Sequence, residues 1–154
     1  MRQPLAAGVC YNDMKLSNPH KLPIVESFIR LYGSVLQSPE FPEELSVEFL
    51  PLSDDENEYA DILVRLGKRI YLSEREIGKL GLSSPEIFAA LAHELGHIVY
   101  RTHPWHTDSE SRADTLAARI GLRDQMIAVI EKIIASRRYR NLTSLLVQRR
   151  EPRE

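Results

Sequence analysis

The stretch His93-Glu94-Leu95-Gly96-His97 has the residue types and the spacing of a metal-dependent hydrolytic site. Residues four apart lie on one face of an α-helix, so the imidazoles of His93 and His97 can point at one ion. Glu94, one step round the helix, can reach a water molecule beside that ion and act as its general base. The stretch therefore predicts a site that activates water.

The residues around this motif favour a buried helix over a polar surface helix. A helix that is apolar nearly all round is buried, and buried polar groups need partners, which a metal ion would supply. Gly96 adds to this, because glycine inside a helix costs about 1 kcal/mol relative to alanine. We therefore expect another backbone to approach closely at Gly96. The apolar flank is Ile87, Phe88, Ala89, Ala90, Leu91, Ala92, Leu95, Ile98 and Val99.

A catalytic zinc ion normally takes three protein ligands and keeps its fourth position for water. One candidate for the third ligand is His103, which completes the spacing HExxHxxxxxH. In the metzincin pattern the chain turns at a glycine within that gap, but this chain has Tyr100 there, a poor residue for a strained turn. The Met-turn of that pattern is also missing, since Met126 sits in an apolar helical stripe.

Glu110 is the better third ligand. In a second predicted helix, over residues 109–121, Glu110 shares one face with Ala113, Asp114 and Ala117. The two alanines would let this helix press against the first one. Asp114, one turn after Glu110, could then accept a hydrogen bond from the outer nitrogen of His93 or His97 and fix the orientation of that ring.

Each of these acids also has a purely structural explanation. Thr107 and Glu110 have the spacing of a helix capping box. Asp114 could instead pair with Arg112 or Arg119 at the surface. These explanations account for the acids one at a time, but not for the alanine face between them.

The rest of the chain predicts one small sheet and several helices. An order of helix, small sheet and further helices is typical of an α+β domain. We expect a single domain over 1–154, with an irregular arm over 1–21 and a helical C-terminal extension over 122–154. The expected elements are helix 22–37, strand 45–52, an acidic loop at 53–58, a hairpin over 59–73 that turns at 67–68, and helices over 74–81, 82–101, 109–121, 122–138 and 141–154.

Length, charge and cysteine content are those of an ordinary globular protein of a reducing compartment. The chain has 154 residues, of which 43% are hydrophobic and 27% are charged, as in an ordinary globular domain. A net charge of -2 gives no general attraction to nucleic acid or anionic membranes. Cys10 is the only cysteine, so no internal disulfide can form. With no signal-like or membrane-spanning stretch, the cytoplasm is the expected compartment.

The HExxH helix followed by a "glutamate helix" bearing E-x-x-x-D resembles the gluzincin zinc metallopeptidases. "RIYLSEREIGKLGLSSPEIFAALAHELGHIV" with "ESRAD" resembles the peptidase domain of the CAAX-prenyl-protease and heat-shock membrane protease family. The size and the lack of membrane spans are closer to the minigluzincins. The resemblance covers roughly residues 58–121. It implies a zincin-like fold, with a small antiparallel sheet packed on the active-site helix.

The resemblance also implies how the site would be used. An edge strand, within 62–66 or 69–73, would bind an extended peptide by adding it to the sheet. Minigluzincins are expected to be latent, with a terminal segment covering the cleft. Cys10 or residues 135–154 could play that part here. An oxyanion stabiliser is also needed, and the candidates are Tyr100, His103, His106, Arg137 and Tyr139. Processing of prenylated proteins is not implied, because this chain has no membrane spans.

The sequence thus predicts a zinc-dependent endopeptidase that acts on a peptide or protein. His93, His97 and Glu110 would hold the zinc ion, and Glu94 would activate the water. The alternative is a non-catalytic scaffold or regulator that zinc stabilises.

A third hypothesis is a DNA-associated regulator that uses the basic C-terminus, but neither nucleic acid nor membrane is an expected partner. Trp105 is expected to pack the turn between the two metal-binding helices. The C-terminal arginines are Arg137, Arg138, Arg140, Arg149, Arg150 and Arg153.

Overall fold

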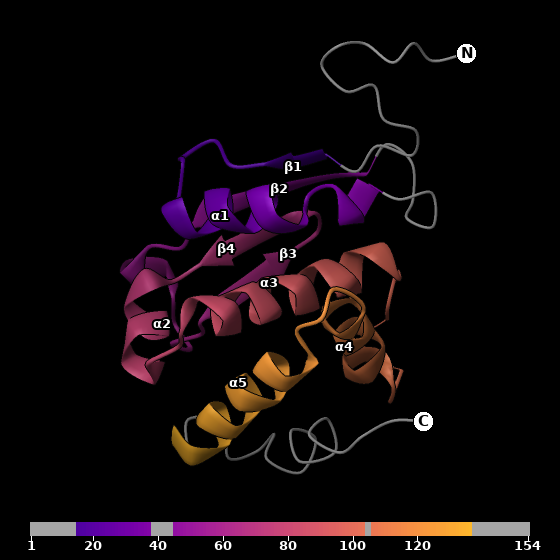
Figure 1. Ribbon diagram of the computed structural model, residues 1–154. Coiled ribbons are helices and arrows are strands. Elements are labelled where there is room, and N and C mark those ends of the chain that lie inside the picture. The colour runs from indigo at the N-terminus through magenta and orange to yellow at the C-terminus, as the bar shows by residue number, and fades with distance from the viewer. Residues whose placement is uncertain (1–14, 38–44, 104–105, 137–154) are drawn as a thin grey trace, which may run out of the picture.

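The computed structural model describes residues 15–37, 45–103 and 106–136 (Figure 1). Several residues considered from the sequence lie outside these ranges, namely Cys10, Trp105, Tyr139 and the C-terminal arginines. Within the described ranges the chain is an α+β fold with a small sheet and a set of helices, as predicted.

The sheet has four strands in the order β1-β2-β4-β3, namely β1 (Lys15–Ser17), β2 (Ser46–Pro51), β3 (Leu63–Leu66) and β4 (Arg69–Leu72). β2 runs parallel to both β1 and β4, and the pair β3–β4 is antiparallel. The sheet is therefore mixed, and the prediction of an antiparallel sheet is wrong. A helix carries the chain from β1 back to the start of β2, and such a crossover makes strands parallel. The predicted hairpin is confirmed, but it places its second strand beside β2.

The strand order decides which of the described strands lie at an edge of the sheet. β4 lies between β2 and β3, so residues 69–73 cannot offer an edge to a peptide, whereas residues 62–66 can. β1 forms the other edge of the sheet. The sequence predicts an irregular arm over 1–21, of which residues 1–14 lie outside the described ranges. The prediction is wrong for β1, where the backbone N–H of Lys15 donates to the carbonyl of Leu45 at 2.6 Å.

The helices up to residue 136 follow the expected order, and the helix expected over 141–154 lies outside the described residues. The predicted helix over 22–37 is shorter than expected, because it ends at Tyr32 and a separate 3-10 turn covers Val35–Gln37. A 3-10 turn over Asp54–Glu56 lies in the predicted acidic loop. The α-helices are α1 (Pro23–Tyr32), α2 (Glu74–Leu80), α3 (Ser84–Val99), α4 (Ser109–Arg119) and α5 (Arg123–Ser136).

The start of α3 is fixed by local chemistry. Ser83 is the N-cap, and Ser83 and Glu86 form a reciprocal capping box. Glu86 also binds the ammonium of Lys132 on α5 at 2.6 Å. Burial alone would raise the pKa of Glu86, but the hydrogen bonds from Lys132 and from the backbone of Ser83 outweigh it, so this pKa lies below its ordinary value. The ion pair between Glu86 and Lys132 therefore connects the start of α3 with α5.

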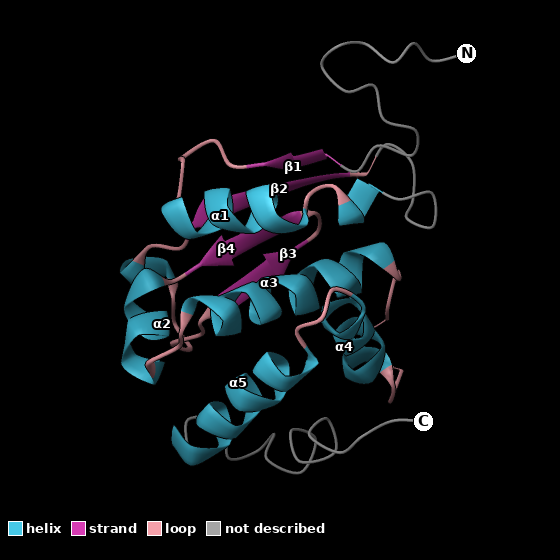
Figure 2. Ribbon diagram, in the orientation of Figure 1, coloured by secondary structure: helices cyan, strands magenta, loops and turns pink. Residues whose placement is uncertain are grey.

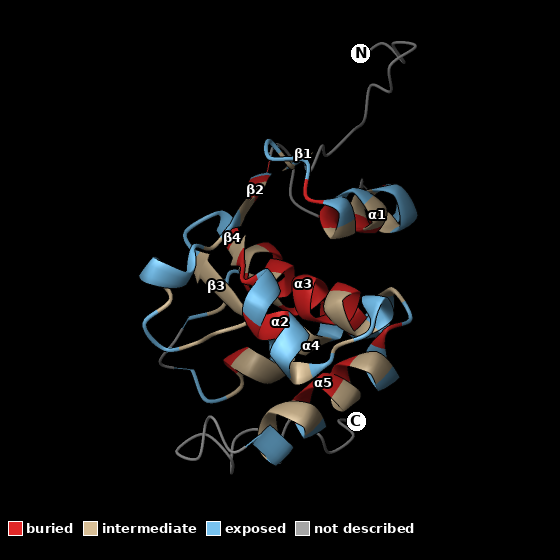
Figure 3. Cartoon of the chain, turned by 90° about the vertical axis from the view of Figure 1, so that its left-hand side faces the viewer, coloured by how far each residue is buried: buried red, intermediate tan, exposed pale blue. Residues whose placement is uncertain are grey.

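The helices gather on one face of the sheet, with α3 at the centre (Figures 2 and 3). Phe28 of α1 contacts Phe49 of β2 and Phe88 of α3, and this aromatic group joins the first helix to the sheet and to α3. α3 also packs against α4 and α5. α3 is therefore buried along most of its length, as its apolar flanks predicted.

No helix in the described ranges is both long enough and apolar enough to cross a lipid bilayer.

Candidate metal centre

α3 and α4 bring three ligand-type side chains together. Ligand atoms of His93, His97 and Glu110 all lie within 4.8 Å of one another, and no other such group occurs in the described part of the chain. The two histidines are buried, at 4% and 6% exposure. The predicted third ligand is thus placed with the HExxH histidines, and this group could bind a metal ion.

The orientation of the two rings matches what a ligand set requires. Nε2 of His93 lies 3.3 Å from Oε1 of Glu110, and Nε2 of His97 lies 2.9 Å from Oε2 of the same carboxylate. The ring centroids are 4.7 Å apart and the ring planes are nearly perpendicular, at 85°. Because the side chain of Glu110 is 42% exposed, the group is open to solvent on the α4 side.

The start of α4 tests the capping explanation for Glu110. The helix begins at Ser109 with Asp108 as N-cap, and no side chain caps it. The capping box of Thr107 and Glu110 is therefore not formed. Glu110 points instead at the two imidazoles.

Gly96 explains how α4 comes so close. A Cβ atom at Gly96 would overlap the carbonyl oxygen of Ala113 and lie 3.0 Å from its Cα atom. The two backbones therefore meet at a position where only glycine fits, as the sequence predicted. Ala113 and Ala117 are both fully buried in this contact region.

The outer nitrogen of each imidazole has an oxygen partner. Nδ1 of His93 lies 2.6 Å from Oδ1 of Asp114, as predicted for one of the two histidines. Nδ1 of His97 lies 2.6 Å from Oγ1 of Thr102, which the sequence analysis missed. When both Nδ1 atoms donate to these oxygens, both Nε2 atoms are left with a lone pair for a metal ion.

Glu94 lies at the edge of the group and has a partner that the sequence did not suggest. Its Oε1 pairs with Nε of Arg65 at 3.3 Å, and its Oε2 lies 3.9 Å from Nε2 of His93. Arg65 is on β3, opposite the buried Ile70 of β4, so both side chains point to the helix-covered face. No alternation within Leu63–Leu66 marks Arg65, because only the register of β3 with β4 places it on the inner face.

The other histidines are not part of the ligand group. His103 and His106 meet edge to face between α3 and α4, with ring centroids 5.2 Å apart and an angle of 79° between the ring planes. The hydroxyl of Tyr100 accepts a hydrogen bond from Arg119 at 3.3 Å. An oxyanion-stabilising role for these three residues stays a prediction.

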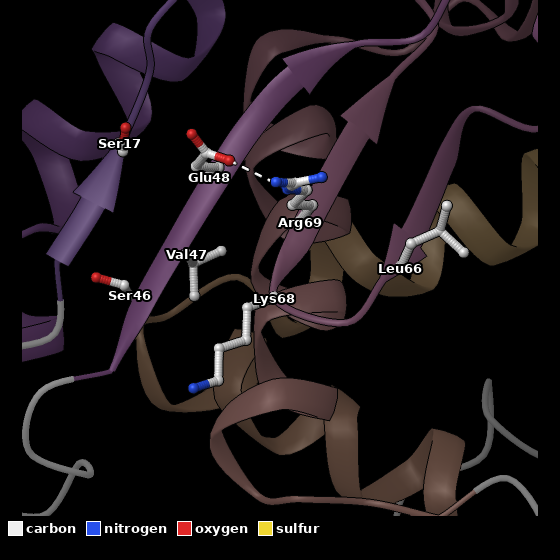
Figure 4. A pocket seen from close by; sticks show the side chains of 7 residues that line it. All are labelled: Ser17, Ser46, Val47, Glu48, Leu66, Lys68 and Arg69. Atoms are coloured by element: carbon white, nitrogen blue, oxygen red, sulfur yellow. Dashed lines mark hydrogen bonds and ion pairs between the residues drawn. The ribbon is translucent and has the colours of Figure 1, made fainter.

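A separate hollow of about 500 Å³ lies around the turn of the β3–β4 hairpin (Figure 4). Glu48 and Arg69 pair across it at 3.2 Å. The pKa of Arg69 is raised, first by a hydrogen bond with Tyr71 and then by the charges of Tyr71 and Glu48. None of the metal-centre residues lines this hollow. Its lining is Ser17, Ser46, Val47, Glu48, Leu66, Lys68 and Arg69.

Comparison with protein-family models, with curated proteins and with solved structures finds no match to this chain. The geometry of the candidate metal centre is therefore what indicates a function for this chain.

Proposed function

We propose that this protein is a zinc-dependent endopeptidase of the gluzincin type. The observation that carries the proposal is the convergence of two buried Nε2 atoms on one carboxylate, with each Nδ1 atom held by an oxygen. Two imidazoles and a carboxylate are a donor set of catalytic zinc sites, and they leave a position for water. A cytoplasmic setting remains part of the proposal.

Glu94 supplies the base. When bound, zinc would polarise the scissile carbonyl and lower the pKa of a water molecule. Oε1 of Glu94 is engaged by Arg65, so Oε2, on the side of His93, is the atom that accepts the proton from the attacking water. Glu94 then returns this proton to the leaving amine. Arg65 orients the carboxylate for both transfers.

β3 offers a place for the substrate. It is an edge strand of the sheet, and it lies against α3 as well as against β4. An extended peptide that adds to β3 would form backbone hydrogen bonds with it and run past Arg65 and Glu94. The substrate we propose is therefore a peptide or a protein segment in extended form. Nucleic acid and membrane are not proposed as partners.

One observation favours a second function. Arg65 holds Glu94 in an ion pair, and the candidate ligands join α3 to α4. In a zinc-stabilised scaffold the same ligands would tie these helices together, and Glu94 would serve only as an ion-pair partner. The two functions differ in whether Glu94 is needed for chemistry.

The test combines zinc stoichiometry with cleavage of a broad peptide library. We expect the intact chain to bind one zinc ion, and Glu94→Gln to bind it equally well without cleaving any peptide. Glu110→Ala should lose zinc affinity, whereas the matched His103→Ala should keep it. The reverse result for these two variants would show that the third ligand is wrong.

Latency is tested with the same assay. Variants that lack residues 1–14 or residues 137–154 should cleave faster than the intact chain if a terminal segment covers the cleft. Zinc binding without cleavage in the intact chain and in both truncations would favour the scaffold.

A further inference from the structure

The end of α3 is built so that it places one hydroxyl on a candidate ligand. The N–H of Thr102 donates to the carbonyl of His97 at 3.1 Å, and the N–H of Arg101 donates to the carbonyl of Ile98 at 3.3 Å. Arg101 has a left-handed backbone, with φ of 51°. These features define a Schellman motif, which reverses the chain directly after the helix. The reversal brings Thr102 back to His97.

The two candidate histidines are held by oxygens of different kinds. Asp114 holds Nδ1 of His93, and an ionised carboxylate can only accept a hydrogen bond. The hydrogen of the His93 ring is therefore kept on Nδ1. Thr102 holds Nδ1 of His97 at the same distance, 2.6 Å, but a hydroxyl can accept or donate. The ring of His97 is therefore not restricted to one tautomer.

Each direction of the Thr102 bond gives His97 a different role. When Nδ1–H donates to Thr102, Nε2 carries a lone pair and can bind a metal ion. When the Thr102 hydroxyl donates to Nδ1, Nε2 carries the hydrogen and can donate it to Oε2 of Glu110, which lies 2.9 Å away. A bond to a carboxylate is stronger than one to a neutral acceptor, so the second arrangement is preferred without metal.

We propose that Thr102 is a positioning residue of the metal centre, whose reversible hydroxyl lets His97 exchange between a metal-ligand tautomer and a hydrogen-bond-donor tautomer. The proposal rests on the metal site proposed above and adds a difference between its two histidines. His93 is a ligand of fixed tautomer, and His97 becomes a ligand when its hydrogen moves from Nε2 to Nδ1.

The first experiment measures zinc affinity by competition with a chelator. Thr102→Val keeps the shape of the side chain but removes the hydroxyl, and it should weaken zinc binding about 10–100-fold, the usual effect of losing the oxygen partner of a ligand. Thr102→Ser keeps a hydroxyl and should restore most of the affinity. Thr115→Val is the matched control, because the Thr115 hydroxyl donates only to the carbonyl of Arg112 on the exposed side of α4.

The second experiment reads the tautomers directly by ¹H–¹⁵N NMR of the histidine rings in the full chain. After chelator treatment, the hydrogen should be on Nδ1 of His93 and on Nε2 of His97. Added zinc should move only the His97 hydrogen, to Nδ1. A His97 hydrogen that is on Nδ1 before and after zinc would overturn the exchange.

The outcomes separate this inference from the proposed function. If wild type and Thr102→Val bind zinc equally while His97→Ala does not bind it, the metal site stands and the role of Thr102 is wrong. If the wild type binds no zinc, the proposed function itself fails. Loss of affinity in Thr102→Ser as well as in Thr102→Val would also overturn the role of the hydroxyl.

Discussion

Replacement of Gly96 by alanine tests the contact on which the candidate metal centre depends. Two effects oppose each other in Gly96→Ala. Alanine in the middle of a helix is better than glycine by about 1 kcal/mol. Against this, the new methyl group would overlap the carbonyl of Ala113, a backbone atom that cannot move without shifting α4.

The overlap should be the larger effect. Forcing an extra methyl group into a packed core typically costs about 1–3 kcal/mol, and a backbone obstacle favours the upper end. We therefore expect Gly96→Ala to lower the free energy of unfolding by about 1–2 kcal/mol, after the gain in helix propensity. α4 also carries Glu110 and Asp114, so its displacement should weaken zinc binding by about tenfold or more.

Gly78→Ala is the matched control, because Gly78 is also in a helix and a Cβ atom there meets nothing within 4 Å. It should stabilise the chain by about 1 kcal/mol and leave zinc affinity unchanged. Urea unfolding of the chelator-treated protein and a zinc titration measure both quantities. Equal stabilisation by the two substitutions, with zinc affinity intact, would refute the close approach of α3 and α4.

Three further predictions concern the surroundings of the site. The pKa of Glu86 in the folded chain lies below its ordinary value of 4.5, which applies to the unfolded chain. The pair with Lys132 therefore stabilises the fold at any pH above 4.5, and this stability is lost as the pH falls through the pKa of the folded chain. Lys132→Met should therefore cost about 1 kcal/mol in urea unfolding at neutral pH, and the cost should shrink in acid. Arg101→Gly should stabilise the fold by about 0.5–1 kcal/mol in the same assay, since glycine tolerates the left-handed turn, and a loss of stability there would contradict the Schellman geometry. Asp114→Ala should weaken zinc binding about 10–100-fold in a chelator competition, whereas Asp124→Ala on the exposed face of α5 should not.

Much of the site could be predicted because its signals are local. The HExxH spacing, the apolar flanks and Gly96 are all properties of one helix. The alanine face of the next helix then pointed to Glu110 and Asp114. The start of α3 is local in the same way, since the capping box of Ser83 and Glu86 involves neighbouring residues only.

The remaining features depend on contacts that a linear pattern does not contain. Arg65 reaches Glu94 across 29 residues, and only the register of β3 with β4 shows that it points inward. Strand β1 and its pairing with β2 were missed because a strand of three residues is too short to show an alternation of apolar and polar side chains. The contact of Thr102 with His97 was missed because it depends on the left-handed backbone of Arg101. The sequence does not predict this conformation, since arginine rarely adopts it.

The residues of the candidate metal centre are also close together along the chain, and this has a consequence for folding. The bond between His93 and Asp114 spans 21 residues, and the bond between His97 and Thr102 spans 5. Closing such short loops costs little chain entropy, so α3 and α4 can pair and bind a metal ion early. The ion pair of Glu94 with Arg65 must wait until the sheet docks. For the proposed zinc peptidase we therefore expect the folding chain to bind its metal ion before Glu94 pairs with Arg65.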